Sequence, residues 1–362
     1  MVSNIWVLSS FFTYTYLPAI TIDMQQFQSD IDTVEVASAS STNAVTFTNA
    51  RPFNTSTPAP ISSLLSLSSP DKTELHDLFH FIFTTPAETI NWRFLLSVEA
   101  VFFHHPKAKV IIHSQTIPET GTDFDLFKQA NYSLMVQNYS FEDLLQTSTF
   151  FNQDKTAIQS FMAVLEDRRK NKFWYSHETD LIRLLLLEQS GGIYLDTDMH
   201  LIKPITKKEY TNALGFQGRG NDKVNGAMMI FDEHNEFVQD CLQDAISIAS
   251  KSYSQRDWEI FGPRLLTRHW NERKNETDII RAFPMNTLYP YGIYKTKQCF
   301  VTPKEEFNPI DEGVTIAVHL NTGITKEYNY TLAGSVCDEM FKKNCIFCDF
   351  NHTLDREPER PQ

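Results

Sequence analysis

Two aspartates, Asp196 and Asp198, stand two residues apart directly after a short apolar run, residues 193–195. Carboxylates at this spacing can bind one divalent cation together, or one can bind it directly and the other through water. Either arrangement leaves coordination positions open for the phosphate oxygens of a ligand. Because many surface loops contain Asp-x-Asp by chance, the surrounding residues decide what the pair indicates.

A second charged pair precedes the aspartates. Asp180 and Arg183 are spaced i, i+3 in a run that favours a helix, so they share one helical face. Taken alone, such a pair is more often a structural ion pair than part of a site. Gly191 fits the left-handed position that ends a helix. The strand that follows delivers Asp196 and Asp198 at its carboxyl end, where open α/β sheets bind ligands.

Hydrophobic patterning predicts the elements that position these residues. Residues 77–83 and 109–113 are apolar runs suited to buried strands. Between them, Thr85 as N-cap and Pro86 at the first helical position predict a helix that runs to His104. Strand, helix and strand in this order form a parallel pair and predict an α/β domain. The other predicted elements are a helix capped by Ser176 with its body over 180–189, strands over 193–195, 225–232 and 314–319, and helices over 234–249 and 262–270.

The composition excludes some classes of function. The 362 residues carry 32 Lys and Arg against 45 Asp and Glu, a formal charge of −13. This excess repels phosphate backbones, and no basic stripe interrupts it, so we expect no nucleic-acid partner. With 41% hydrophobic and 13% aromatic residues, the chain can bury a substantial core. No apolar run reaches the roughly 18 residues that a membrane-spanning helix needs.

The chain divides into four segments by composition. Residues 1–27 contain a mostly apolar stretch, residues 5–20, that could be a signal peptide or a shortened membrane anchor; the alternative is a disordered tail, since no Lys or Arg precedes Arg51. Residues 28–74 form a Ser/Thr/Pro-rich stalk. Residues 75–333 hold the predicted α/β domain. Residues 334–362 are a polar, cysteine-containing tail that we expect to lie outside the core.

Glycosylation sequons and cysteines favour the secretory pathway. An odd number of cysteines, five, leaves at least one unpaired within the chain. A disulfide between Cys345 and Cys348, or from Cys337 to a neighbour, is favoured over a zinc site formed with His352. Six Asn-x-Ser/Thr sequons occur, at Asn54, Asn131, Asn138, Asn275, Asn329 and Asn351.

The stretch TDLIRLLLLEQSGGIYLDTDMHLIKPI, residues 179–205, resembles the signature of glycosyltransferase family 32. Three later segments, VNGAMMIF (224–231), GPRLLTR (262–268) and AVH (317–319), resemble its lactosylceramide 4-alpha-galactosyltransferase branch (the alpha-1,4-glycosyltransferases). The likeness extends over roughly residues 75–319. It implies a GT-A fold, a single Rossmann-like α/β domain that binds a nucleotide-sugar and a divalent metal, usually Mn²⁺. It also implies transfer that retains the anomeric configuration.

The resemblance assigns roles to the residues that match the signature. Asp196 and Asp198 would hold the metal that bridges the diphosphate of the donor. Asp180 and Arg183 match residues that grip the donor sugar, and Tyr194 matches a tyrosine that lines the donor site.

Three further positions carry weaker expectations. His319, at the end of a late strand, would complete the metal shell; a histidine at the edge of the core is an equal alternative. Asn225 would contact the donor sugar, or is simply an Asn before a glycine. Gly262-Pro263 starts a helix and would lie near the acceptor. Related transferases carry a Trp soon after the late histidine, whereas Leu320-Asn321-Thr322 follows here, which leaves the acceptor-side stacking surface unassigned.

The chemistry of these residues fits sugar transfer. Breaking the sugar–phosphate bond places negative charge on the departing UDP, which a bound dication and Arg183 would stabilise. No carboxylate is an obvious nucleophile, so we expect the acceptor hydroxyl to attack on the face that the phosphate leaves. Aspartyl-phosphate phosphatases also place Asp-x-Asp after a strand, but Met199-His200 do not match them.

The sequence therefore predicts a metal-dependent retaining glycosyltransferase that moves a hexose, most simply α-galactose from UDP-galactose, onto a hydroxyl of a glycan or glycosphingolipid. We expect a glycoprotein of the Golgi lumen, either secreted or a type II membrane protein. The alternatives are an α-mannosyltransferase that uses GDP-mannose, or an inactive transferase-fold binding protein.

Overall fold

A computed structural model describes residues 77–148, 151, 155–218, 220–251, 257–348 and 353–354. The predicted anchor and stalk, residues 1–27 and 28–74, lie outside the described residues. Among the described residues, no helix combines the length and apolar character required to cross a membrane.

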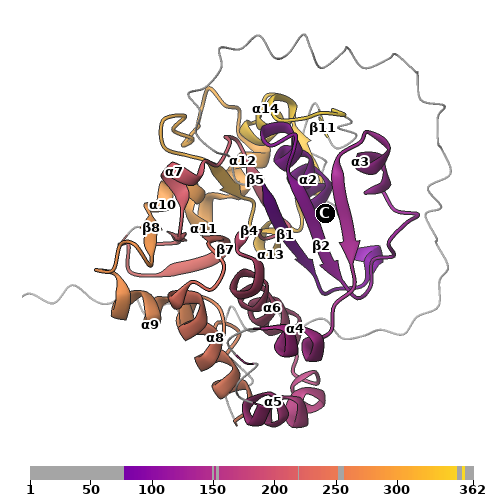
Figure 1. Cartoon of the computed structure of the whole chain (residues 1–362). Helices are drawn as coiled ribbons and strands as arrows, with labels where there is room; N and C mark the ends of the chain where they lie inside the picture. The colour runs from indigo at the N-terminus through magenta and orange to yellow at the C-terminus, as the bar shows by residue number, and fades with distance from the viewer. Residues whose placement is uncertain are drawn as a thin grey trace, which may run out of the picture. The chain divides into compact units, whose positions relative to one another are not determined.

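The centre of the structure is a seven-stranded sheet with the order β3-β2-β1-β4-β7-β6-β8 (Figure 1). β3, β2, β1 and β4 are parallel, β7 is antiparallel to β4 and to β6, and β8 is parallel to β6. The strands are β1 (Leu78–Phe83), β2 (Lys109–Ser114), β3 (Ser133–Gln137), β4 (Gly192–Leu195), β6 (Ala213–Phe216), β7 (Val224–Phe231) and β8 (Arg281–Phe283). Two small sheets pair β5 (Met199–Leu201) with β9 (Ala317–His319) and β10 (Thr331–Leu332) with β11 (Thr353–Leu354).

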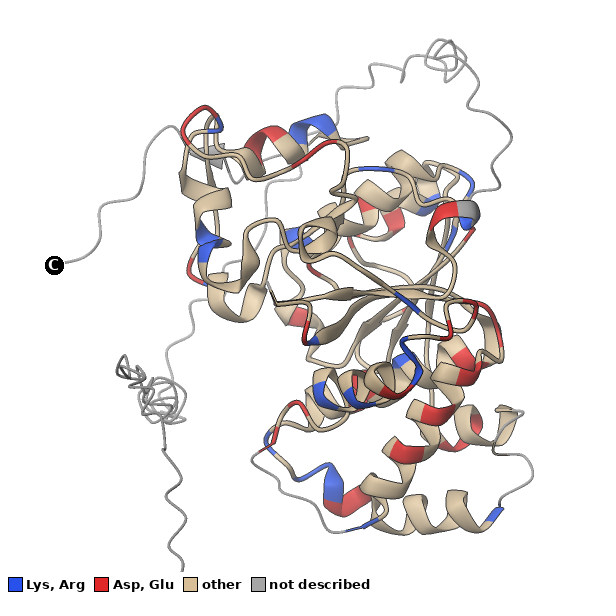
Figure 2. Cartoon of the chain, turned by 90° about the vertical axis from the view of Figure 1, so that its left-hand side faces the viewer, with Lys and Arg blue, Asp and Glu red and all other residues tan. Residues whose placement is uncertain are grey.

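Helices connect the strands, which confirms the predicted α/β class. The longer helices are α2 (Trp92–His104), α5 (Lys155–Arg168), α6 (Trp174–Ser190), α8 (Glu236–Ala249), α9 (Pro263–Arg273) and α14 (Val336–Lys343). The shorter ones are η2 (Ala87–Thr89), α3 (Asp125–Gln129), α4 (Phe141–Thr147), α7 (Lys207–Tyr210), α10 (Met285–Leu288), α11 (Gly292–Lys295), α12 (Lys297–Val301) and α13 (Thr322–Thr325). On the face shown in Figure 2, Lys and Arg are interspersed with Asp and Glu.

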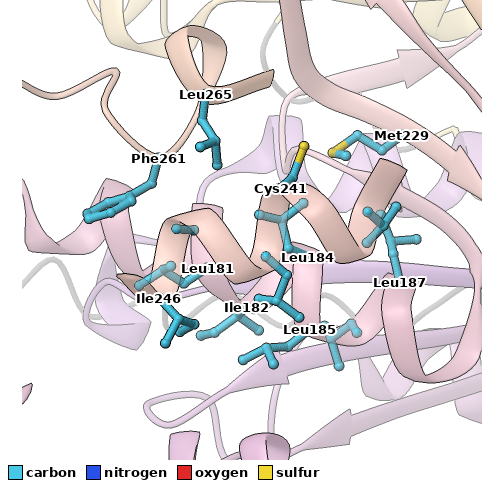
Figure 3. Packing of buried hydrophobic residues seen from close by; sticks show 14 of the residues in the cluster. Leu181, Ile182, Leu184, Leu185, Leu187, Met229, Cys241, Ile246, Phe261 and Leu265 are labelled. Carbon is cyan, nitrogen blue, oxygen red and sulfur yellow. The ribbon is translucent and has the colours of Figure 1, made fainter. Parts of the chain in front are cut away.

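Each face of the sheet packs against its own set of helices, because successive side chains of a strand point to opposite faces. Phe79, Phe81 and Phe83 of β1 belong to the cluster that includes α2 and α3. Ile82 belongs to the opposite cluster, which includes α4, α5, α6, α8 and α9. Figure 3 shows this second cluster, where apolar side chains of α6 lie beside those of α8. This packing fixes α6, which carries Asp180 and Arg183, against one face of the sheet.

Most predicted strands and helices are confirmed, but the start of α2 differs from the prediction. Thr85 does not cap this helix; residues 87–89 form only one 3-10 turn. The cap is Asn91, whose side-chain oxygen accepts hydrogen bonds from the backbone N–H groups of Arg93 and Phe94, at 3.0 and 3.3 Å. Ile90 is not helical, with ψ of 129°, so the turn that begins at Pro86 cannot continue.

The helix that carries the charged pair also begins earlier than predicted. α6 starts at Trp174, so Ser176 lies inside it and not at its cap. Its end matches the prediction, since Gly191 has a φ of +57°. A Cβ at Gly191 would lie 2.6 Å from the backbone nitrogen of Glu233. Both observations require glycine between α6 and β4.

The expectation that the cysteine-containing tail lies outside the core is wrong for its first part. Residues 336–343 form α14, and Val336, Met340 and Phe341 are buried in a third apolar cluster. This helix therefore belongs to the core. Cys337 pairs with Cys299, and Cys345 with Cys348, as disulfides. The favoured disulfide interpretation is confirmed, and these sulfurs are not available as a zinc set.

Candidate active site

The strand pairing of the small β5–β9 sheet brings the candidate residues together. Asp196 follows β4, where its backbone N–H donates to the carbonyl of Ala227 at 2.8 Å. Two residues on, Asp198 precedes β5. In the β5–β9 ladder Met199 pairs with His319. This register places the histidine beside Asp198 although 121 residues separate them in the sequence.

Three ligand atoms converge at this point. His319 Nε2 lies 3.1 Å from Asp198 Oδ1 and 3.9 Å from Asp196 Oδ2. The three residues each offer a ligand atom within 4.8 Å of the others. They are largely buried, with side-chain exposures of 27% for Asp196, 13% for Asp198 and 12% for His319. Asp196 is thus the most exposed of the three.

The remaining oxygen of each aspartate is held by the protein. The Tyr194 hydroxyl donates to Asp196 Oδ1 at 2.5 Å, and the backbone N–H of Thr322 donates to Asp198 Oδ2 at 2.6 Å. Outer hydrogen bonds of this kind orient metal-binding carboxylates. Two oxygens and one imidazole nitrogen thus face a common point. These three donor atoms fit a divalent cation such as Mn²⁺.

Beside these ligand atoms lies the ion pair of α6. Arg183 Nη2 is 3.0 Å from Asp180 Oδ1 and 3.5 Å from Asp196 Oδ1. Its Nη1 donates to the carbonyl of Gly226 at 2.7 Å, and its guanidinium lies 4.5 Å from the centre of the Tyr194 ring. One buried guanidinium therefore links α6, β4 and β7 and touches both carboxylates.

Two glycines allow this close packing. A Cβ at Gly226 would lie 2.6 Å from Arg183 Nη1, and a Cβ at Gly262 would lie 2.8 Å from Asp180 Oδ2. Gly262 also precedes Pro263 at the start of α9, as the sequence predicts. The Gly262-Pro263 turn therefore lies against the Asp180 carboxylate.

The site carries an excess of negative charge. Burial raises the pKa of Asp180 to about 7, although Arg183 acts in the opposite direction. Burial also acts against ionisation of Asp198, but His319 and the Thr322 N–H hold the pKa of this carboxyl below its usual value. Three carboxyl groups, those of Asp180, Asp196 and Asp198, thus lie near the single guanidinium of Arg183, an arrangement that favours binding of a dication.

Asn225 lies at the start of β7, beside Gly226. Its Oδ1 accepts the Ala227 N–H at 2.7 Å, and its Nδ2 donates to Gln217 Oε1 at 3.1 Å. Both polar groups of its side chain are therefore engaged by the protein in this state. A contact between Asn225 and a donor sugar stays a prediction.

Arg93 is a contributor that the sequence analysis missed. It is 2% exposed, and its guanidinium donates to Thr325 Oγ1 at 2.8 Å, to the Thr325 carbonyl at 2.7 Å and to the Tyr328 carbonyl. These bonds fix the segment that begins with Thr322, whose N–H holds Asp198. A sequence signal was present: Arg93 and Glu99 carry charges in a mostly apolar helix, and both are buried.

Comparisons with known proteins find two glycosyltransferase regions in the chain. Residues 92–219 match the glycosyltransferase sugar-binding region containing a DXD motif, and residues 230–350 match the alpha 1,4-glycosyltransferase conserved region. The mouse lactosylceramide 4-alpha-galactosyltransferase is 26% identical over 254 residues, which is 66% of this chain and 66% of that protein. The human alpha-1,4-N-acetylglucosaminyltransferase is 24% identical over 183 residues, 48% of this chain and 51% of that protein.

Among solved structures, the PaToxG glycosyltransferase is similar at a TM-score of 0.38 and 18% identity, over 56% of this chain and 70% of that one. The chain thus spans about half to two thirds of the length of the two relatives given above. The two regions together cover the Asp-x-Asp turn, the helix before it and the late histidine. The chain therefore carries the glycosyltransferase sugar-binding region with its DXD motif, followed by the alpha 1,4-glycosyltransferase conserved region.

Proposed function

We propose that this protein is a metal-dependent retaining glycosyltransferase that moves a hexose, α-galactose from UDP-galactose, onto a hydroxyl of a glycan or glycolipid. The observation that carries the proposal is the convergence of Asp196 Oδ2, Asp198 Oδ1 and His319 Nε2 next to the buried Asp180–Arg183 pair. The relatives named for galactose and N-acetylglucosamine transfer support a UDP-sugar as donor.

Each group has a task in this proposal. A cation held by Asp196, Asp198 and His319 would bind the diphosphate and stabilise the charge that develops on it. Tyr194 and Thr322 keep the carboxylates turned toward that position. Asp180 and Arg183 line the donor site, and the fixed guanidinium offers a positive charge close to the breaking bond.

The proposed location is the lumen of the secretory pathway. Two disulfides are formed, and the remaining cysteine, Cys241, is buried. The four sequon asparagines among the described residues all lie at exposed positions, where a glycan can be attached: Asn131, Asn138, Asn275 and Asn329. An N-terminal membrane anchor within residues 1–27 remains part of the proposal.

A panel of donors tests the proposal. The full chain is incubated with UDP-galactose, UDP-N-acetylglucosamine, UDP-glucose or GDP-mannose, with Mn²⁺ or with EDTA, and release of the nucleotide is measured. We expect Mn²⁺-dependent release of UDP, fastest from UDP-galactose. Preference for GDP-mannose would select the mannosyltransferase alternative, and failure to bind or hydrolyse any donor would contradict the enzymatic function.

The pH dependence of Mn²⁺ binding is a second prediction. Burial lowers the pKa of His319, but Asp198 and Asp196 outweigh burial and raise it above its usual value. Since only the neutral imidazole binds a cation, affinity for Mn²⁺ should fall as the pH drops through this raised pKa, by up to about tenfold per pH unit. In His319→Asn, the logarithm of the Mn²⁺ affinity should change with pH less steeply, by the contribution of one proton. Equal slopes in the two proteins, measured by calorimetry between pH 5.5 and 8, would contradict the assignment of His319 as a ligand.

A further inference from the structure

One tyrosine beside the candidate metal site is not explained by the contacts described so far. Tyr289 follows α10 and is 2% exposed. Its ring meets the His319 ring edge to face, with centroids 5.4 Å apart and an interplanar angle of 83°. Among the described residues, the Tyr289 hydroxyl has no hydrogen-bond partner. A buried hydroxyl without a partner is uncommon in native proteins and calls for a specific reason.

The ring cannot readily turn to find a partner, because α10 is fixed on both sides. The N–H of Ile316 donates to the Thr287 carbonyl at 3.0 Å, and Thr315 Oγ1 donates to the Asn286 carbonyl at 2.9 Å. On the other side, Leu288 fills the space above Gly215 of β6, where a Cβ would lie 2.4 Å from its Cδ1. The same bonds that fix α10 therefore hold Tyr289 next to the strand that carries His319.

The charges around Tyr289 are those of the candidate active site. Burial raises the pKa of this phenol well above its usual value, and Asp196 and Asp198 raise it further, while Arg183 acts in the opposite direction. A tyrosine hydroxyl is a hydrogen-bond donor near neutral pH. The neighbouring Tyr194 hydroxyl donates to Asp196, but Tyr289 donates to neither carboxylate.

We propose that the Tyr289 hydroxyl is a hydrogen-bond donor for the diphosphate of the nucleotide, reserved by the fold for an oxygen that arrives with the ligand. The Tyr289 ring packs against His319, and Asp196 and Asp198 act on its phenol, so a diphosphate bound at these three residues would lie beside Tyr289. The pairing of a neutral donor with an anionic oxygen is a strong hydrogen bond in a buried site. This inference rests on the proposed function, since it supposes that a nucleoside diphosphate is bound.

Tyr291 supplies a matched control. It is 4% exposed, and its hydroxyl also lacks a hydrogen-bond partner among the residues that the structure describes. Burial alone raises its pKa, with no contribution from any carboxylate or guanidinium. Tyr291 thus shares the burial of Tyr289 but not its place beside the site.

The test compares Tyr289→Phe and Tyr291→Phe with the wild type. Binding of UDP and of UDP-galactose is measured by calorimetry with Mn²⁺, and the melting temperature is measured with and without UDP and Mn²⁺. We expect Tyr289→Phe to weaken UDP and UDP-galactose by a similar factor, about tenfold, because the lost bond is to the shared diphosphate. Tyr291→Phe should bind both as the wild type does.

The melting temperatures separate binding from folding. Without ligand, Tyr289→Phe should melt at the same temperature as the wild type or higher, because it removes a buried hydroxyl that has no partner. Its stabilisation by UDP and Mn²⁺ should be smaller. Unchanged UDP affinity, or a loss for UDP-galactose alone, would overturn the proposed contact with the diphosphate. If Tyr289→Phe melts at a lower temperature without ligand but binds UDP as the wild type does, Tyr289 has a structural role only. If the wild type itself binds no nucleoside diphosphate, the proposed function fails, and this inference with it.

Discussion

Replacing Asp198 with Asn should lower Mn²⁺-dependent turnover of the sugar donor about a thousandfold, which corresponds to about 4 kcal/mol of transition-state stabilisation. The substitution removes a negatively charged ligand atom that faces His319. It keeps the shape of the side chain and an oxygen that can still accept the Thr322 N–H. The fold should therefore survive, and release of UDP with and without Mn²⁺ measures the effect.

An exposed carboxylate provides the control for this substitution. Asp167 lies on α5 with 64% of its side chain exposed, and its ion pair with Lys170 lies on the surface. Exposed pairs of this kind contribute little to stability, so Asp167→Asn should leave both turnover and melting temperature unchanged. Wild-type turnover in Asp198→Asn, in a protein whose circular dichroism is also unchanged, would exclude the metal role of this residue.

Replacing Arg183 with Met should abolish turnover and also lower the free energy of unfolding by about 3 kcal/mol. Met preserves much of the buried volume but leaves Asp180, which is 4% exposed, without its ion-pair partner. Without Arg183 the buried Asp180 carboxyl must stay charged without its partner or take up a proton, and either outcome costs stability. Chemical denaturation measures this loss, and release of UDP measures the activity.

A double variant separates the two effects of Arg183. Adding Asp180→Asn to Arg183→Met removes the unpaired carboxyl, so much of the lost stability should return while turnover stays absent. The two substitutions should thus be strongly non-additive in stability, as expected for residues in contact. Additive losses would mean that the two charges do not interact in the folded protein, against the 3.0 Å separation of Arg183 Nη2 and Asp180 Oδ1.

Local signals explain what the sequence predicts well. The apolar run of β4, the glycine at the end of α6 and the Asp-x-Asp turn all lie within 20 residues, so short-range patterns suffice to place them. The predicted start of α2 was wrong because two local capping signals competed. The helix begins after Asn91 and not after Thr85-Pro86. β3 was missed, because it is a short edge strand in which only two of five residues are buried.

The rest of the site depends on contacts between distant segments. His319 reaches Asp198 only through the β5–β9 register, and Tyr289 reaches His319 only through the fixed position of α10. Arg93 acts on a segment more than 200 residues away. Cys337 likewise pairs with Cys299 across 38 residues, which kept α14 in the core against the expectation of a polar tail. No spacing rule within the sequence encodes these contacts.

Calorimetric titration of the wild-type protein with UDP, in the presence of Mn²⁺ and again in EDTA, tests the central claim most directly. The claim is that Asp196, Asp198 and His319 hold a divalent cation to which the diphosphate binds. We predict one UDP bound per chain with Mn²⁺, and an affinity at least about a hundredfold lower in EDTA, since the two carboxylates would then repel the phosphates. Binding of UDP with equal affinity in EDTA would contradict this account.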